Sequence, residues 1–293
     1  MHVAITGASG MLGTALQTRL RADGHTVAPV LRGPGKDWDP ANGWLRPGLL
    51  EGVDAVVNLA GASIGEGRWT AKRKQELIDS RVTSTRLLVA AIASMERRPA
   101  LVSASAIGYY GDRGDTVVDE TSAKGEGFLA DLVEQWESEA VKAEDAGVRT
   151  VRLRFGVVLS KDGGALKRMM LPFKFGAGGR LGSGNQWFSW VTLDDATRAL
   201  SLALTEPSMQ GVYNVTAPNP VTNRELTKAL AKAMHRPALF PVPGFALRLL
   251  LGEAADELLL GGQRVLPKRL QEAGFTFEHT DLEVALRHVL ANE

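Results

Sequence analysis

The sequence contains no cysteine, which excludes disulfide bonds, thiolate nucleophiles and cysteine-ligated metal sites. An excess of one charge is also missing, because 34 Lys and Arg residues balance 33 Asp and Glu residues, so neither nucleic acid nor an anionic membrane is expected as a partner. The densest apolar stretch, residues 245–251, is interrupted by Arg248 and falls far short of the ~20 residues of a membrane span. The five histidines lack metal-site spacing, so no metal is expected. Without a basic, apolar leader, we expect the protein to be cytoplasmic.

What the sequence does contain is a regular alternation of short β-rich runs and longer helical stretches. The β-rich runs are residues 2–6, 26–32, 53–59, 100–105, 148–154 and 212–215, and the helical stretches between them are 11–22, 70–94, 128–146 and 194–205. This alternation indicates an α/β fold with a doubly wound parallel sheet that helices cover on both faces. Beyond Pro218 the pattern is mainly helical, and prolines punctuate it.

Glycines stand at positions 7, 10 and 13, between the first β-rich run and the first helical stretch. Glycine is needed where φ is positive, where backbone approaches a pyrophosphate, and where a helix packs closely on a strand. The helix start then offers unpaired N–H groups to phosphates. A tight turn without a ligand is the structural alternative, but the agreement of strand, turn and helix favours a Rossmann-type dinucleotide site. The residues expected to contact NAD(P) here are Thr6, Gly7, Ser9, Gly10, Met11, Leu12 and Gly13.

The choice between NAD and NADP is predicted at the end of the second β-rich run. An Asp or Glu at this place would bind the ribose hydroxyls of NAD, whereas this sequence has Arg32. A guanidinium can pair with a 2′-phosphate, which favours NADP and leaves NAD open, and a solvated loop arginine is the alternative. The third run ends in Ala60 and Gly61, whose small side chains would let the adenosine lie close. A strand that simply stops at a glycine is the competing interpretation.

Together these features resemble the extended short-chain dehydrogenase/reductase family, which includes the sugar-nucleotide epimerases. The stretch Ser103-Ala-Ser-Ala-Ile-Gly-Tyr-Tyr-Gly111 is similar to the family's serine-rich strand, and Arg154-Phe-Gly-Val-Val is similar to its next strand. Asp79-Ser-Arg-Val, Trp136-Glu137 and the C-terminal residues 266–275 resemble an atypical branch known as epimerase family proteins. The likeness runs along essentially the whole chain. It implies a Rossmann-type domain over residues 1–217, with part of 160–192 contributing to a substrate lobe, and a small helical domain over 218–293.

The resemblance also implies which residues contact the coenzyme and how the chain could assemble. In that branch NADP contacts fall near Arg32, Leu59, Ala60 and Arg81, and more weakly at Glu76 and Val157. Taken alone, Arg81 on a long polar helix is more often a solvated surface charge. Extended members often pair through the helices that flank the sheet, so the resemblance is compatible with a homodimer. The partner that we expect first is a small-molecule substrate.

The parent family's catalytic Tyr-x-x-x-Lys pair is absent. Four residues beyond the only tyrosines, Tyr109, Tyr110 and Tyr213, stand Arg113, Gly114 and Ala217. The usual mechanism, in which the lysine lowers the pKa of the phenol, therefore cannot be carried over. The remaining hydroxyl candidates are Ser105, expected near the nicotinamide, and Tyr110, and neither has an activating base beside it in sequence.

Carboxylates and aromatic residues give further candidates for the site. Asp131 and Glu134 lie on the replacement helix and would act as acid/bases only if they face the crevice; solvent exposure is the alternative. Residues 176–190 combine glycines with three aromatic residues and are a candidate substrate wall, or else a tight turn over core aromatics. Asp194-Asp195 is interpreted as a helix cap rather than a catalytic dyad.

Two functions of different classes follow from the sequence. The first is an NADP(H)-binding oxidoreductase, or an epimerase/dehydratase-like enzyme, that acts on a small substrate. The second is a catalytically weak NADP(H)-binding sensor or regulatory protein, which the missing catalytic pair favours.

Overall fold

The computed structural model describes residues 1–291, and at its centre lies a six-stranded sheet in which all the paired strands are parallel. The strands lie in the order β12-β8-β6-β5-β1-β2. Their bounds are β1 (His2–Thr6), β2 (Thr26–Val30), β5 (Ala55–Asn58), β6 (Ala100–Ala106), β8 (Thr150–Phe155) and β12 (Gly211–Val215). The predicted doubly wound parallel sheet is confirmed.

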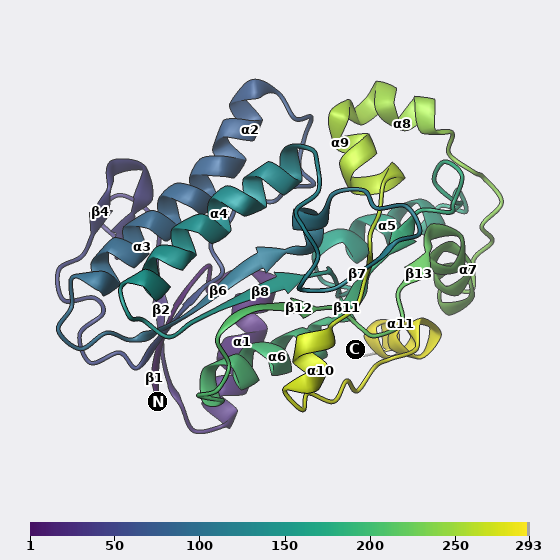
Figure 1. Ribbon diagram of the computed structural model, residues 1–293. Helices are drawn as coiled ribbons and strands as arrows, with labels where there is room; N and C mark the ends of the chain where they lie inside the picture. Colours follow the sequence, from purple (N-terminus) through teal and green to yellow (C-terminus); the bar gives the residue numbers. More distant parts are fainter. Residues whose placement is uncertain (292–293) are drawn as a thin grey trace.

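Helices cover both faces of this sheet, which explains why its strands are apolar along their length. Helices α1 (Met11–Ala22) and α6 (Leu193–Thr205) pack together on one face, and α3 (Ser84–Ala93) and α4 (Phe128–Asp145) pack together on the other (Figure 1). Val3, Ile5 and Leu16 belong to the core on the first side, whereas Ala4, Val56 and Leu88 belong to the core on the second. The alternation of side chains along β1 thus feeds two separate cores.

The sheet has one topological switch point, between β1 and β5. The chain goes from β1 to β2 at the edge of the sheet and then returns past β1 to form β5. A short hairpin of β3 (Trp38–Asp39) and β4 (Trp44–Leu45), joined by the 3₁₀ turn η1 (Pro40–Asn42), fills this connection. Ligands of open α/β sheets bind at such a point, outside the carboxyl ends of the strands.

The predicted long helix over residues 70–94 is divided in three. Helix α2 (Ala71–Ile78) is followed by a π-helical turn, η2 (Asp79–Thr83), and then by α3. Single π turns inside helices are frequent at functional sites. Arg81 lies in this turn.

The second lobe is mainly helical and is built from several parts of the chain. It contains α5 (Gly164–Lys174), α7 (Asn223–Ala233), α8 (Gly244–Leu251), α9 (Glu253–Ala255), the π-helical turn η4 (Asp256–Leu260) and α11 (Leu282–Ala291), while α10 (Lys268–Glu272) packs on β12. Three two-stranded ladders join early to late segments: β9 (Val157–Leu159) with β11 (Trp190–Thr192), β10 (Trp187–Phe188) with β13 (Val221–Thr222), and β7 (Val117–Val118) with β14 (Arg264–Val265).

Figure 1 places α8 and α9 beyond the end of the sheet, beside α2. Within residues 1–291, no helix is both long enough and apolar enough to serve as a membrane span.

Candidate functional site

The glycine turn after β1 leaves no room for side chains at two of its three glycines. Gly7 has φ +66°, and a Cβ there would lie 2.5 Å from the carbonyl oxygen of Leu59 at the end of β5. A Cβ on Gly13 would lie 2.3 Å from the carbonyl oxygen of Gly7, so this glycine lets α1 pack onto the turn. Gly10 differs, because its Cβ would meet only that same oxygen, at 3.2 Å, and otherwise faces open space.

No side chain of residues 1–291 caps the N-terminus of α1. No side chain accepts a hydrogen bond from its first turn, and the first turn contains no acidic residue. The Thr14 N–H donates to the carbonyl oxygen of Gly10 at 2.8 Å, so helix geometry leaves the N–H groups of Met11, Leu12 and Gly13 without helical acceptors. These groups and the helix dipole make the turn a favourable place for an anion.

Arg32 follows β2 at the same edge of the sheet and is exposed. The nearby Asp37 carboxylate is already engaged: it accepts a 2.8 Å hydrogen bond from the Leu31 N–H and a 2.8 Å ion pair from Arg46. Within residues 1–291, Arg32 has no carboxylate partner. Its guanidinium is therefore available to an external anion.

Arg81 is placed differently from the expectation of a solvated surface charge. Its guanidinium lies under the loop after β5, where a Cβ on Gly61 would come within 3.1 Å of its Cζ, and its Nη2 donates to the Ala62 carbonyl oxygen at 2.9 Å. Burial, helped by the charge of Arg73, lowers the pKa of Arg81 to about 10. No carboxylate within residues 1–291 forms an ion pair with it. A half-buried cation without a carboxylate partner suits a bound phosphate.

The other residues predicted for the coenzyme fall into two groups. Thr6, Ser9, Leu59 and Ala60 lie in or against the glycine turn, and the Thr6 hydroxyl donates to Asn58 at 2.8 Å. Val157 opens β9, beyond the end of β8. Glu76 is exposed on α2 and ion-paired to Arg73 at 2.7 Å. The structure thus brings the turn, the end of β5 and Arg81 together, whereas Glu76 faces solvent.

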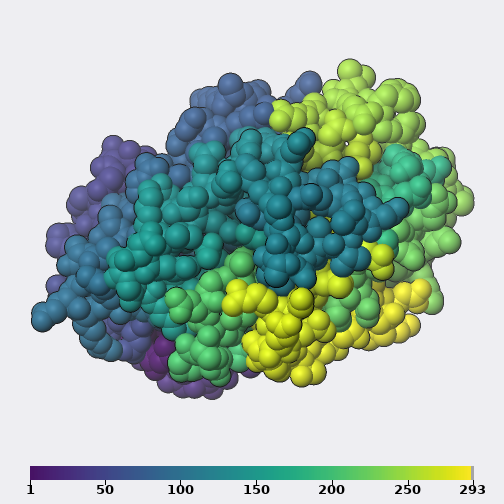
Figure 2. All heavy atoms as spheres, in the orientation of Figure 1, coloured from purple at the N-terminus to yellow at the C-terminus, as the bar shows by residue number. Residues whose placement is uncertain are grey.

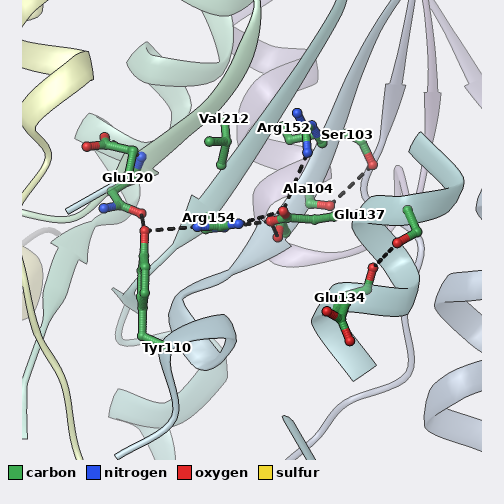
Figure 3. A network of polar contacts seen from close by, with 12 residues as sticks. Ser103, Ala104, Tyr110, Glu120, Glu134, Glu137, Arg152, Arg154 and Val212 are labelled. Carbon is green, nitrogen blue, oxygen red and sulfur yellow. Dashed lines mark hydrogen bonds and ion pairs between the residues drawn. The ribbon is translucent and has the colours of Figure 1, made fainter. Parts of the chain in front are cut away.

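Ser105 and Tyr110, the predicted catalytic residues, belong to one buried polar network around Arg154. Figure 3 shows Tyr110, Arg154 and Glu137 of this network. The Ser105 hydroxyl donates to Glu137 Oε1 at 2.5 Å. Arg154 donates to both Glu137 oxygens at 2.7 Å and to the Tyr110 hydroxyl at 3.0 Å, and Tyr110 in turn donates to Asn214 at 2.8 Å. The network joins β6, α4, β8 and β12 behind the end of β6.

The electrostatics of this network are those of a buried ion pair. Burial opposes charge on Arg154, yet Glu137 and Tyr110 outweigh it and raise the pKa of the guanidinium. Burial also raises the pKa of Tyr110 to about 12, although Arg154 and Asn214 act against it. Full burial of Tyr110 and the engagement of both hydroxyl protons favour a positioning role over direct proton transfer. The catalytic assignment of the two residues stays a prediction.

The carboxylates proposed on the replacement helix face solvent. Asp131 and Glu134 accept ion pairs from Lys124 at 2.8 and 2.7 Å, and their side chains are about half exposed or more. Together they raise the pKa of Lys124. Solvent exposure, the alternative to acid/base chemistry, therefore describes their position.

A cavity of about 250 Å³ lies where the two lobes meet. It is bounded by η3 (Ile107–Tyr110), which follows β6, by the first turn of α4, and by the segment from α8 to η4. Glu257 from η4 reaches across and accepts 2.8 Å hydrogen bonds from the N–H groups of Phe128 and Leu129, so it caps α4. The volume is below the ~300–1,000 Å³ of sites for drug-sized ligands.

The predicted substrate wall is only partly exposed. Trp190 is completely buried in the core formed with α7 and α11. Trp187 is partly exposed; its Nε1 donates to Asp115 at 2.8 Å, and the Arg264 guanidinium lies 4.4 Å from its ring centroid.

Asp195 is buried in the first turn of α6 and accepts hydrogen bonds from the Glu278 and His279 N–H groups. The interpretation of Asp194-Asp195 as the cap is wrong, because Thr192 is the N-cap of α6; the two carboxylates lie in the first turn, where they act with the helix dipole.

Sequence reasoning missed Glu137, Arg154 and Glu257 as site residues. Glu137 and Arg154 stand in stretches that resembled the family, but nothing local indicated that they pair across α4 and β8. Glu257 was missed because its partners, the first amides of α4, lie 128 and 129 residues away.

The sheet order, the glycine turn at the switch point and the unpaired cations define a Rossmann-type dinucleotide-binding protein. The family model described as the NAD dependent epimerase/dehydratase family matches residues 3–216. The chain belongs to this family. A second family model, described as a domain of unknown function, matches residues 242–289, within the helical lobe.

Relatives and solved structures cover the whole chain. An epimerase family protein of Mycobacterium bovis is 47% identical over 289 residues, 97% of this chain and 96% of the relative. One from Bacillus subtilis is 40% identical and covers 100% of this chain and 99% of its own. The crystal structure of human epimerase family protein SDR39U1 with NADPH is 36% identical, with a TM-score of 0.91 and 100% coverage of both chains. UDP-glucose 4-epimerase of Thermus thermophilus, at 18% identity and TM-score 0.78 over 99% of this chain and 98% of that chain, shares the fold.

Proposed function

We propose that this protein binds NADP(H) at the carboxyl ends of β1, β2 and β5 and acts on a small substrate as an oxidoreductase or an epimerase/dehydratase-like enzyme. One observation carries the proposal: three sets of N–H donors that no carboxylate of residues 1–291 binds lie along this edge of the sheet. These are the first-turn amides of α1, the Arg32 guanidinium and the Arg81 guanidinium. The NADPH in the crystal structure of the human relative supports the same coenzyme.

Each of these groups suits a different part of the coenzyme. The α1 amides would hold the pyrophosphate, Arg32 the 2′-phosphate, and Ala60 and Gly61 would leave room for the adenosine. Arg81 would add positive charge beneath the loop after β5. When bound, the nicotinamide supplies or accepts a hydride, and the chain has to orient it and exclude water.

Ser105 gains in the structure the carboxylate that its sequence neighbourhood lacks. Glu137 accepts its proton at 2.5 Å and would be the group that takes it up. The same carboxylate is bound by Arg154 through two hydrogen bonds, which weakens it as a base. For Ser105 to orient a substrate carbonyl from the end of β6, its single proton would have to turn from Glu137 to the carbonyl oxygen, and the arrangement does not restore a tyrosine–lysine pair.

The engagement of both hydroxyl protons also favours the second candidate function, a catalytically weak NADP(H)-binding sensor. The test is to follow NADPH absorbance with a panel of carbonyl compounds and sugar nucleotides. For an enzyme, we expect turnover of at least one compound, and Ser105→Ala should lower kcat by ~10²-fold with unchanged NADPH affinity. Tight NADPH binding without turnover of any compound would assign the sensor function instead.

Two glycine variants separate coenzyme binding from folding. In Gly10→Ala the new methyl group occupies the open space above the turn, so we expect NADPH affinity to fall by ~10-fold or more with little loss of stability. In Gly13→Ala the methyl group meets backbone at 2.3 Å, which should destabilise the fold by about 1–3 kcal/mol. Calorimetric titration and thermal unfolding measure the two effects. Wild-type NADPH affinity in Gly10→Ala would contradict the placement of the phosphates.

A further inference from the structure

The most exposed large apolar side chains among residues 1–291 lie in two segments that are joined to each other. Among residues 1–291, the seven most exposed large apolar side chains lie at 57–81% exposure, and all of them belong to two segments. The first segment is the end of α5, and the second runs from residue 239 through α8. The seven residues are Leu171, Phe175, Leu239, Phe240, Phe245, Leu249 and Leu250, called here the α5–α8 patch.

Backbone hydrogen bonds hold the two segments side by side. The Phe240 N–H donates to Gly178 at 3.1 Å, the Val242 N–H to Arg180 at 2.9 Å, and the Gly182 N–H to Val242 at 2.9 Å. A Cβ on Gly179 would overlap the Phe240 carbonyl, so the contact is as close as backbone allows. The two segments that carry the patch are therefore joined directly within the helical lobe, although they lie about 65 residues apart in sequence.

The charges in these segments are all of one sign. No Asp or Glu occurs between residues 163 and 193 or between 226 and 252. The basic side chains include Lys174, Arg236 and Arg248; Arg248 is paired with Asp256, whereas Lys174 and Arg236 are exposed without an ion pair within residues 1–291. The near-neutral net charge of the chain predicted no affinity for an anionic membrane. It does not reveal that these two segments carry only positive charges.

We propose that the α5–α8 patch binds an anionic lipid surface. Segments that bind at the membrane–water interface combine exposed Phe and Leu with unpaired Lys and Arg. Their apolar side chains enter the headgroup region, and their cations contact lipid phosphates. Helix α8 protrudes at the upper right edge of the molecule, as the yellow-green surface in Figure 2 shows, and a protruding surface meets a flat bilayer more readily than it encloses a peptide. A second copy docked by two-fold symmetry would bring the unpaired cations of both copies together.

The test is co-sedimentation of the full chain with vesicles of phosphatidylcholine alone or mixed equally with phosphatidylglycerol. We expect binding to the mixed vesicles and at least ten-fold weaker binding to phosphatidylcholine. Raising the salt from about 0.1 to 1 M shortens the screening length from ~10 to ~3 Å and should release much of the protein. No binding of the wild type to the mixed vesicles would overturn the proposal.

Paired variants show whether the patch itself is responsible. Phe245→Ser with Leu249→Ser should weaken vesicle binding at least ten-fold because two apolar side chains no longer enter the lipid. Lys174→Glu with Arg236→Glu should abolish the preference for the anionic lipid. The control, Val117→Ser with Val284→Ser, changes apolar residues that are 45% and 47% exposed outside the patch and should bind as the wild type does.

Each variant must keep its thermal midpoint and its affinity for NADPH, so a failure to fold is recognised. Equal weakening in the control pair would overturn the assignment to the patch. Light scattering tests whether a second copy of the chain covers the patch instead. If the wild type is a dimer and the Phe245→Ser/Leu249→Ser variant is a monomer, the patch serves self-association, and the proposal is overturned.

Discussion

Arg154→Met is expected to lower the free energy of unfolding by about 3–5 kcal/mol, the cost of leaving one partner of a buried ion pair without the other. The side chains of Arg154 and Glu137 are 4% and 6% exposed, so water cannot replace the lost guanidinium. Glu137 would keep only the Ser105 hydroxyl and the more distant Arg152, whose Nη1 lies 3.6 Å from Oε2. Denaturant unfolding measures the loss, and the change should appear in the midpoint rather than in the slope.

The double variant Arg154→Met/Glu137→Leu is the matched comparison. Replacing both charges by apolar side chains of similar size removes the unpaired carboxylate, so the double variant should regain most of the stability that the single variant loses. Tyr110→Phe removes one neutral partner and should cost only about 1 kcal/mol. If the double variant were as unstable as the single one, the destabilisation would come from packing, and the ion pair would not be its cause.

Much of the nucleotide-binding half could be predicted from the sequence because its determinants are local. The alternation of β-rich runs with helical stretches predicted the six strands of the sheet, and α1 and α4 begin at the expected residues. Gly7 and Gly13 are required by contacts within the turn or with the next strand, so their spacing alone carried the prediction. Local sequence periodicity records exactly such short-range requirements in a parallel sheet.

The remaining features depend on contacts between distant residues, which no local pattern contains. The π-helical turn that carries Arg81 lies inside a helical pattern that continues through it, so the pattern predicted one helix. Ser105, Glu137 and Arg154 come from three elements, and only the fold makes them one network. The stacked rings of His279 and His288, with centroids 4.4 Å apart, likewise join residues that seemed scattered.

The helical content of the second lobe was predicted, but the way in which it is joined to earlier parts of the chain was not. Its sequence beyond Pro218 indicated helices, whereas the ladders β7–β14 and β10–β13 tie it to segments that precede residue 190. The local excess of positive charge was also missed. The net charge of the whole chain combines the acid-free segments around α5 and α8 with acidic segments elsewhere, so the two cancel. Composition describes a whole chain, whereas a surface is formed by the few segments that folding brings together.

Arg32→Glu is expected to weaken NADPH binding by ~10- to 100-fold while changing NADH binding far less, because only NADPH carries the 2′-phosphate that the guanidinium would contact. The engaged state of Asp37 sharpens this expectation. Its carboxylate is bound to the Leu31 N–H and to Arg46, and it forms no ion pair with Arg32. Calorimetric titration with both coenzymes gives the two affinities directly.

The control for Arg32→Glu is Arg21→Glu, which makes the same charge change on the exposed last turn of α1, away from the turn that α1 begins with. Since surface charges beyond about 10 Å are screened at 0.1 M salt, this control should leave both affinities within about two-fold. Equal losses of NADPH and NADH in Arg32→Glu would mean that the residue acts on the shared part of the coenzymes. The 2′-phosphate contact would then belong elsewhere, and Arg81, the other guanidinium without a carboxylate, would be the group to replace next.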